Sequence, residues 1–202
     1  MLSQHGKILC AVVLLLLAGG LNAQSRSVVI DTENSVIQWT GSSVTSRHTG
    51  FVMLLEGQIE VDGEKIRAGR FVMDMRSIET WGVAVGEAKL RLERHLKSAD
   101  FFDVENHPIA IFQLSSATPT RQALPGETVY QIAGDLTIKG ITHAINFEAI
   151  IDLSNEKAQA KGEFRIDRTR YGLQYRSDKF FEDLGDKLIY DDFLITFYIR
   201  SM

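Results

Sequence analysis

Apolar and polar residues alternate with a period of two over most of this chain, and this pattern limits the folds that it can adopt. The clearest example runs from Phe51 to Val61, where apolar side chains are separated by Glu56, Gln58 and Glu60. A strand with one buried face has this pattern. We therefore predict an all-β fold with a short first strand over 25–31 and about eight long strands over 36–45, 51–61, 69–76, 109–117, 129–138, 141–153, 158–166 and 188–200.

One segment interrupts the alternation. Between Val85 and Ala99, apolar residues recur at intervals of three and four, with charged residues between them. This spacing predicts one amphipathic helix of about four turns. Pro108 cannot continue a helix, because it lacks the N–H and clashes with the preceding turn. We expect the helix Val85–Lys97 and the apolar corner Phe101–Phe102 to close one mouth of a barrel.

The connections between the predicted strands are mostly short, and Asp62-Gly63 and Lys139-Gly140 have the composition of tight turns. Strands joined in this way pair antiparallel. Eight of them can close into an up-and-down barrel, which removes the exposed sheet edges. The exceptions are a predicted loop at Pro119–Glu127 and a long polar connection at Asp167–Lys187. A barrel of this size either fills its interior with side chains or holds one small ligand, which here would be apolar.

The first 23 residues have the order of a secretory signal peptide: Lys7, an apolar run from Ile8 to Ala18, and Ala23 at the expected cleavage site. The run is shorter than the ~20 residues that span a bilayer, and no later segment is long enough. We expect a single domain over 24–202 that is periplasmic or secreted. The single cysteine, Cys10, lies in the signal, so the domain has no thiol chemistry.

Charge and motifs exclude several classes of function. The chain has 26 acidic and 22 basic residues, a net charge of −4, which argues against a nucleic-acid partner. No Gly-x-Ser-x-Gly elbow, His-Glu-x-x-His pair or phosphate-binding glycine loop is present. His48, His95, His107 and His143 lack the spacing of a zinc site. We therefore predict no metal, no cofactor and no catalytic residue.

Four motifs occur in order along the chain: Trp39 with His48–Phe51, His95–Val104 followed by Pro108, Gly134–Thr142, and Gly162–Gly172. Together they resemble the YceI-like family, also called the polyisoprenoid-binding or lipid-binding YceI-like domain, over about Ser27–Ile199. The resemblance implies an extended lipocalin-like barrel that binds a long isoprenoid or another amphiphile in its lumen. It also implies a possible homodimer. The segment Gln174–Asp192 is longer and more acidic than the family pattern, which leaves the shape of one barrel end and the ligand length open.

Candidate lumen residues follow from the inward faces of the strands and from the helix. They are Trp39, Phe51, Met53, Phe71, Met73, Leu92, Leu96, Phe102, Phe112, Phe147, Phe164, Phe193 and Phe197. Candidate contacts to a lipid head group are His48, Lys97 and Arg168, of which arginine matches the geometry of phosphate.

Two other functions remain open at this stage. The same barrel could be an enzyme for an isoprenoid-like substrate, with His48 or His143 as the base. It could also be a packed barrel without a lumen, acting as a stress or interaction protein through its surface.

Overall fold

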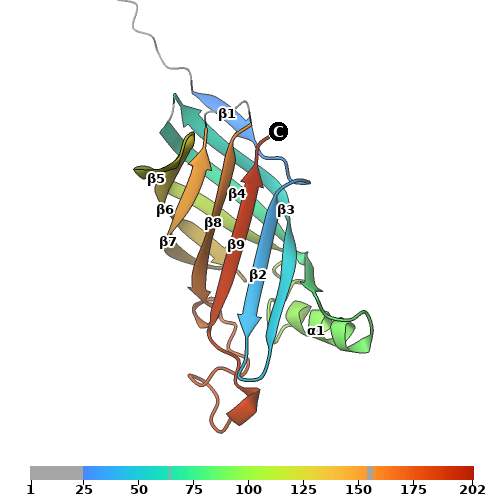
Figure 1. Ribbon diagram of the computed structural model, residues 1–202. Helices are drawn as coiled ribbons and strands as arrows, with labels where there is room; N and C mark the ends of the chain where they lie inside the picture. The colour runs from blue at the N-terminus through green and yellow to red at the C-terminus, as the bar shows by residue number, and fades with distance from the viewer. Residues whose placement is uncertain (1–24, 64, 154–156) are drawn as a thin grey trace, which may run out of the picture.

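The computed structural model describes residues 25–63, 65–153 and 157–202 (Figure 1). The predicted signal peptide over 1–23 and the expected turn at residues 155–156 lie outside these ranges. The elements in chain order are β1 (Arg26–Val29), β2 (Val36–Ser42), β3 (Arg47–Asp62), β4 (Lys65–Trp81), α1 (Glu87–Lys97), β5 (Ile109–Leu124), β6 (Glu127–Ile138), β7 (Ile141–Asp152), β8 (Gln159–Asp167), the short 3-10 helices η1 (Arg168–Tyr171) and η2 (Gly185–Lys187), and β9 (Asp192–Arg200).

Eight strands close into an antiparallel barrel. The sheet runs β3-β2-β9-β8-β7-β6-β5-β4, and β4 pairs again with β3 to complete the ring. The predicted eight-stranded antiparallel barrel is therefore confirmed. The short β1 pairs with β3 over Gln58–Val61, on the edge where β2 pairs with Arg47–Val52. Together β1 and β2 thus cover one edge of the long β3, as Figure 1 shows.

The helical insertion packs at one end of the barrel (Figure 1). Leu96 of α1 is buried, and so are Phe101, Phe102 and Val104 of the corner that follows it. The predicted amphipathic helix is confirmed, but it begins at Glu87. The side chain of Val85 lies before the helix and is 96 % exposed.

The prediction that Phe51 and Met53 face the lumen is wrong. The pairing of β3 with β4 is irregular between Phe51 and Met53 and again between Leu54 and Glu56. An extra residue in a strand reverses which side chains point inward. Val52 consequently lies on the inner face, whereas Met53 is 68 % exposed and Phe51 contacts the exposed Trp81 on the outer face.

The predicted loop at Pro119–Glu127 is also wrong, because β5 continues to Leu124. Pro119 lies opposite Tyr130 in the ladder, beside a register shift between Pro119 and Arg121. Proline is tolerated in a strand at such an irregularity, since the missing N–H breaks no regular pair there. The turn occurs later, at Gly126, whose φ of 85° is in the left-handed region that favours glycine.

No helix in the described part of the chain is long and apolar enough to cross a bilayer.

Candidate binding site in the barrel lumen

The interior of the barrel contains a cavity of about 190 Å³. Nine of the predicted lumen residues line it: Trp39, Phe71, Met73, Phe102, Phe112, Phe147, Phe164, Phe193 and Phe197. Apart from Gln159, the other lining side chains are aliphatic residues and Met75, and the Gln159 amide oxygen accepts a hydrogen bond from the Tyr198 hydroxyl. The lumen therefore presents hydrocarbon surface to any molecule inside it.

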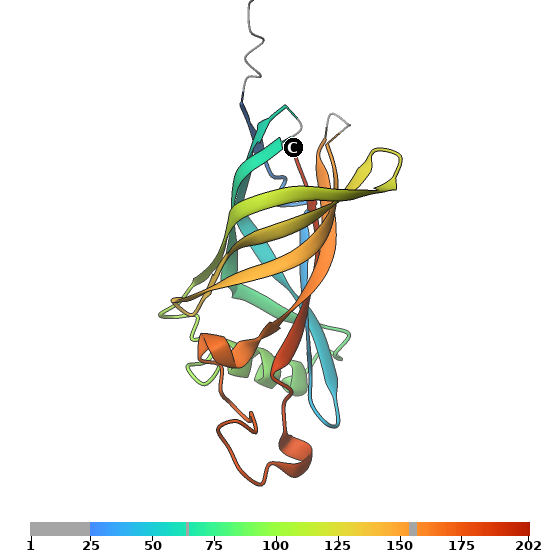
Figure 2. The ribbon, with the colours of Figure 1, turned by 90° about the vertical axis from the view of Figure 1, so that its left-hand side faces the viewer.

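The lining extends along much of the barrel. On β9 it runs from Phe193 to Ile199, a length of roughly 20 Å at ~3.3 Å per residue. Trp39, Ile138 and Phe102 line the end near α1, and residues such as Ile66 and Leu153 line the opposite end. Figure 2 shows the β5–β6 and β7–β8 hairpins at that opposite end. The cavity is thus elongated along the barrel.

Aromatic rings meet across the middle of the lumen. Phe112 of β5 lies 6.3 Å from Phe71 and 5.7 Å from Phe147, measured between ring centroids. Phe147 and Phe164 are stacked at 4.4 Å, and Phe197 contacts both of them. These rings line the cavity between its two ends.

The end of the lumen beside α1 is closed by the corner that follows the helix. Phe102 lines the cavity, whereas Leu92 and Leu96 pack in the surrounding apolar cluster and do not line it. The Lys139 ammonium donates to the carbonyls of Ala99 and Phe101, both at 3.0 Å. The β6–β7 turn, in which Lys139 adopts a left-handed φ of 51°, thus holds the corner against the barrel end.

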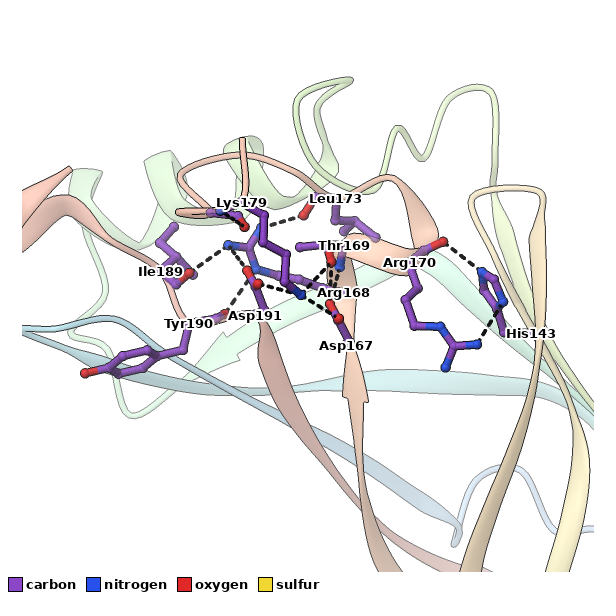
Figure 3. A network of polar contacts seen from close by, with 11 residues as sticks. His143, Asp167, Arg168, Thr169, Arg170, Leu173, Lys179, Ile189, Tyr190 and Asp191 are labelled. Carbon is purple, nitrogen blue, oxygen red and sulfur yellow. Dashed lines mark hydrogen bonds and ion pairs between the residues drawn. The ribbon is translucent and has the colours of Figure 1, made fainter. Parts of the chain in front are cut away.

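Arg168 was predicted to contact a head group, and that prediction is wrong. Its side chain is 2 % exposed, and its guanidinium donates to the carbonyls of Leu173, Ile189 and Tyr190 (Figure 3). Burial lowers the pKa of the guanidinium, and the nearby Asp191 carboxylate, 3.5 Å away, opposes this shift. Arg168 instead ties the long connection after β8 to the barrel.

Two carboxylates and a lysine surround Arg168 (Figure 3). The Lys179 ammonium lies 2.8 Å from Asp167 and 3.0 Å from Asp191. Burial by itself would raise the pKa of Asp167, but hydrogen bonds from Lys179 and Thr169 bring it below its usual value. Hydrogen bonds to the carboxylates of Asp167 and Asp191 raise the pKa of Lys179. This network stabilises the connection and lies outside the cavity lining.

The two other head-group candidates stay predictions. His48 is half-buried near the β2–β3 hairpin, with its Nε2 3.4 Å from the Ser46 hydroxyl. Lys97 is half-buried at the last residue of α1. Neither residue lines the cavity. In the described ranges, no three His, Cys, Asp or Glu side chains gather as a metal site would require.

His143 was considered as a base for catalysis, but both of its ring nitrogens form hydrogen bonds with Arg170. Nε2 lies 2.9 Å from the Arg170 carbonyl, and Nδ1 lies 3.1 Å from the Arg170 guanidinium (Figure 3). Because a guanidinium only donates, Nδ1 accepts, and the Nε2–H donates to the carbonyl. His143 therefore joins β7 to η1.

Sequence reasoning missed several lining residues on β3, β4 and β6. Val52 was missed because the strand irregularity was not visible in the alternation. Ile78 was missed because β4 continues past Arg76, to Trp81. Ile132, Leu136 and Ile138 were assigned to a strand but not to the site, although their period-two spacing was sufficient to find them.

A closed eight-stranded antiparallel barrel around an apolar cavity is a fold that can hold one apolar ligand. Comparison with known families agrees with this class: the sequence profile of the YceI-like domain matches residues 29–201. The chain therefore belongs to the YceI-like family.

Curated relatives include a UPF0312 protein of Pseudomonas putida, 26% identical over 141 residues, which are 67% of this chain and 66% of that protein. A UPF0312 protein of Photorhabdus laumondii is 32% identical over 105 residues, which are 52% of this chain and 50% of that protein. The match thus spans slightly less than two thirds of the length of the Pseudomonas putida protein and half of the Photorhabdus protein.

Solved structures share the fold at low sequence identity. Burkholderia cenocepacia BcnA superposes with a TM-score of 0.65 at 18% identity, covering 86% of this chain and 99% of BcnA. A polyisoprenoid binding domain from Saccharophagus degradans gives 0.64 at 16% identity, covering 86% of this chain and 96% of that domain. The YCEI protein of Campylobacter jejuni gives 0.51 at 12% identity, covering 98% and 94%. These likenesses support the barrel assignment.

Proposed function

We propose that this protein binds a long-chain isoprenoid or a similar amphiphilic lipid in its lumen and sequesters or carries it without chemical change. After removal of the signal peptide, this would occur in the periplasm or outside the cell. The observation that carries the proposal is the elongated cavity whose lining is hydrocarbon from one end to the other. The description of the Saccharophagus neighbour as polyisoprenoid binding is consistent with it.

The hydrophobic effect supplies enough affinity for such a ligand. Each CH₂ group moved from water into an apolar lumen contributes ~0.8 kcal/mol. Several isoprene units would therefore bind firmly without a specific polar contact. The same lining supports binding over catalysis, because the described residues that line the lumen include no side chain of the types that act as nucleophile or general base.

The size of the cavity adds a requirement. Its volume of about 190 Å³ is below the ~300–1,000 Å³ that is typical of ligand pockets. A long chain can enter only if the aromatic rings across the middle of the lumen change rotamer. Met73 and Met75 in the lining favour such adaptation, because the thioether side chain is flexible.

Extraction of the lipid bound by the native protein is the direct test. The protein is purified from its own cells, weighed by native mass spectrometry and extracted with organic solvent. We expect one long-chain lipid per chain. The purified protein should also bind geranylgeraniol at equilibrium. A protein that is empty and also fails to bind geranylgeraniol would overturn the proposal.

Phe112→Asp tests whether the lumen is the binding site. A carboxylate there has no polar partner, so we expect the affinity for geranylgeraniol to fall by about 100-fold or more, since ~1.4 kcal/mol corresponds to tenfold. Phe180→Asp is the matched control, because Phe180 is half exposed and lies outside the cavity lining. If Phe112→Asp unfolds the barrel, Ala117→Phe fills the lumen without adding charge and should also lower the affinity.

A further inference from the structure

The seam between β7 and β8 is incomplete. Only Ala149–Asp152 of β7 and Gln159–Gly162 of β8 form strand pairs. On their other edges, β7 pairs with β6 over its whole length, and β8 pairs with β9 over its whole length. Residues 141–148 and 163–167 therefore face each other without a ladder. Figure 2 shows the two strands meeting near the top of the view and separating below.

A second short pairing occurs between β4 and β5, but other elements cover it. Only Gly69–Asp74 of β4 pairs with β5. Beyond that point, the N–H of Met75 bonds to the Pro108 carbonyl, and α1 packs along β4 with Glu93 bonded to Thr80. The unpaired part of β4 is thus held by the helical insertion. No helix of comparable length lies over the β7–β8 seam in the described residues.

Side chains close the β7–β8 seam. Phe147 and Phe164 stack across it at 4.4 Å with an angle of 17° between the ring planes. Both residues also line the cavity. A ring pair, and not a backbone ladder, therefore separates the lumen from the outside at this point of the wall.

The lower end of the seam is fastened by His143 and Arg170 (Figure 3). Two hydrogen bonds link His143 with Arg170, and in the described part of the chain these bonds join residues 141–148 of β7 to η1. Tyr171 packs edge-on against the His143 ring, with 5.1 Å between centroids. The seam is thus bounded above by the Ala149–Gly162 pair and below by the two contacts between His143 and Arg170, one to the backbone carbonyl and one to the guanidinium of Arg170.

We propose that the β7–β8 seam is the route by which the hydrocarbon chain of the ligand enters and leaves the lumen, with the Phe147–Phe164 pair as its cover and the His143–Arg170 pair as its lower fastening. The proposal rests on the lumen being the binding site. Opening the wall here breaks no strand ladder, whereas opening any fully paired seam breaks a row of backbone hydrogen bonds. The same ring movement that opens the seam also enlarges the cavity where these two rings line it.

A cross-link across the seam tests the proposal. Asn146 and Arg165 are exposed and would face each other if the pairing continued. Asn146→Cys and Arg165→Cys are combined in a Cys10→Ala background and joined by bismaleimidoethane. Ile150→Cys and Lys161→Cys, which are opposite each other in the paired part, give the matched control.

The probe is dansylaminoundecanoic acid, whose uptake is followed by energy transfer from the lumen residue Trp39 in a Trp81→Phe background.

The seam cross-link should slow uptake and release by about tenfold or more and leave the equilibrium affinity nearly unchanged, because gating changes rates and not the site itself. The control cross-link should leave the rates unchanged. Arg170→Met, which removes the guanidinium and with it one of the two hydrogen bonds to His143, should accelerate uptake. Unchanged rates in the seam cross-linked protein would overturn the proposed route while leaving lumen binding intact. Failure of the uncross-linked protein to bind the probe would instead count against the proposed function.

Discussion

The Glu93 carboxylate of α1 accepts hydrogen bonds from both the backbone N–H and the hydroxyl of Thr80, at 2.8 and 3.0 Å. Thr80 lies near the end of β4 and is 1 % exposed. This contact joins α1 to the barrel wall. It thereby helps to position the corner Phe101–Phe102, which closes one end of the lumen.

Removal of this carboxylate should loosen the helix. In Glu93→Ala, the buried donors of Thr80 lose their acceptor, and we expect the free energy of unfolding to fall by about 1–3 kcal/mol. Hydrogen exchange should increase in α1 and the corner before the rest of the barrel. Glu87→Ala is the control. The Glu87 side chain is exposed, and its ion pair with Arg94 is long, at 3.8 Å, and lies at the surface. Equal stability of the two variants would contradict the anchoring role.

The same contact predicts a dependence on pH. Burial by itself would raise the pKa of Glu93, but the hydrogen bonds from Thr80 and the nearby Lys89 lower it below the ordinary 4.5. A carboxyl whose pKa is lowered on folding stabilises the protein above its unfolded pKa, and this stability is lost as the pH falls through the folded pKa. Denaturant unfolding from about pH 5 downward should therefore lose less stability in Glu93→Gln than in the wild type. If the stabilities of Glu93→Gln and the wild type fall in parallel as the pH is lowered, the lowered pKa of Glu93 does not contribute to stability.

Substitution of Arg168 tests whether this residue stabilises the fold or binds the head group of a lipid. Arg168→Met leaves three carbonyls without their donor and removes the guanidinium 3.5 Å from Asp191, which keeps its contact with Lys179. The loss should destabilise the protein by about 3–5 kcal/mol, since each buried polar group left without a partner costs about 1–3 kcal/mol. Lys179→Met removes a half-exposed partner of Asp167 and Asp191 and should destabilise the protein less than Arg168→Met does, because an ion pair in contact with water contributes little. Chemical denaturation compares the two. Where Arg168→Met remains folded, its relative affinity for phosphorylated and neutral polyprenols should match that of the wild type, and a selective loss of the phosphorylated lipid would restore the head-group role.

The alternation along the strands and the helical spacing between Val85 and Ala99 were sufficient to predict the barrel and the helix at one of its ends. These features depend on local periodicity, which the order of residues contains directly. Phe112 and Phe164 were found for the same reason, since each lies on a regular inward strand face, and Phe102 belongs to the apolar corner after the helix.

The role of Arg168 could not be predicted in this way. Its acceptors are carbonyls at Leu173, Ile189 and Tyr190, and backbone carbonyls carry no sequence signal. The His143–Arg170 contact depends likewise on how β7 and η1 meet in space. The faces of β3 were missed for a different reason, because both Phe51 and Val52 are apolar and the alternation alone cannot show an irregularity in pairing.

Adjacent positions on β3 offer a sharp test of which face lines the lumen. Val52 lines the cavity, whereas Met53 is exposed on the outer face. Val52→Asp should lower the affinity for geranylgeraniol by about tenfold or more, because a charge without a partner enters the apolar lumen. Met53→Asp places the same carboxylate in water and should leave both the affinity and the stability close to those of the wild type. Equilibrium binding and thermal unfolding of the two variants decide the point. The reverse result, with loss of binding only in Met53→Asp, would mean that the simple alternation from Phe51 holds and that the irregular pairing of β3 with β4 does not occur in solution.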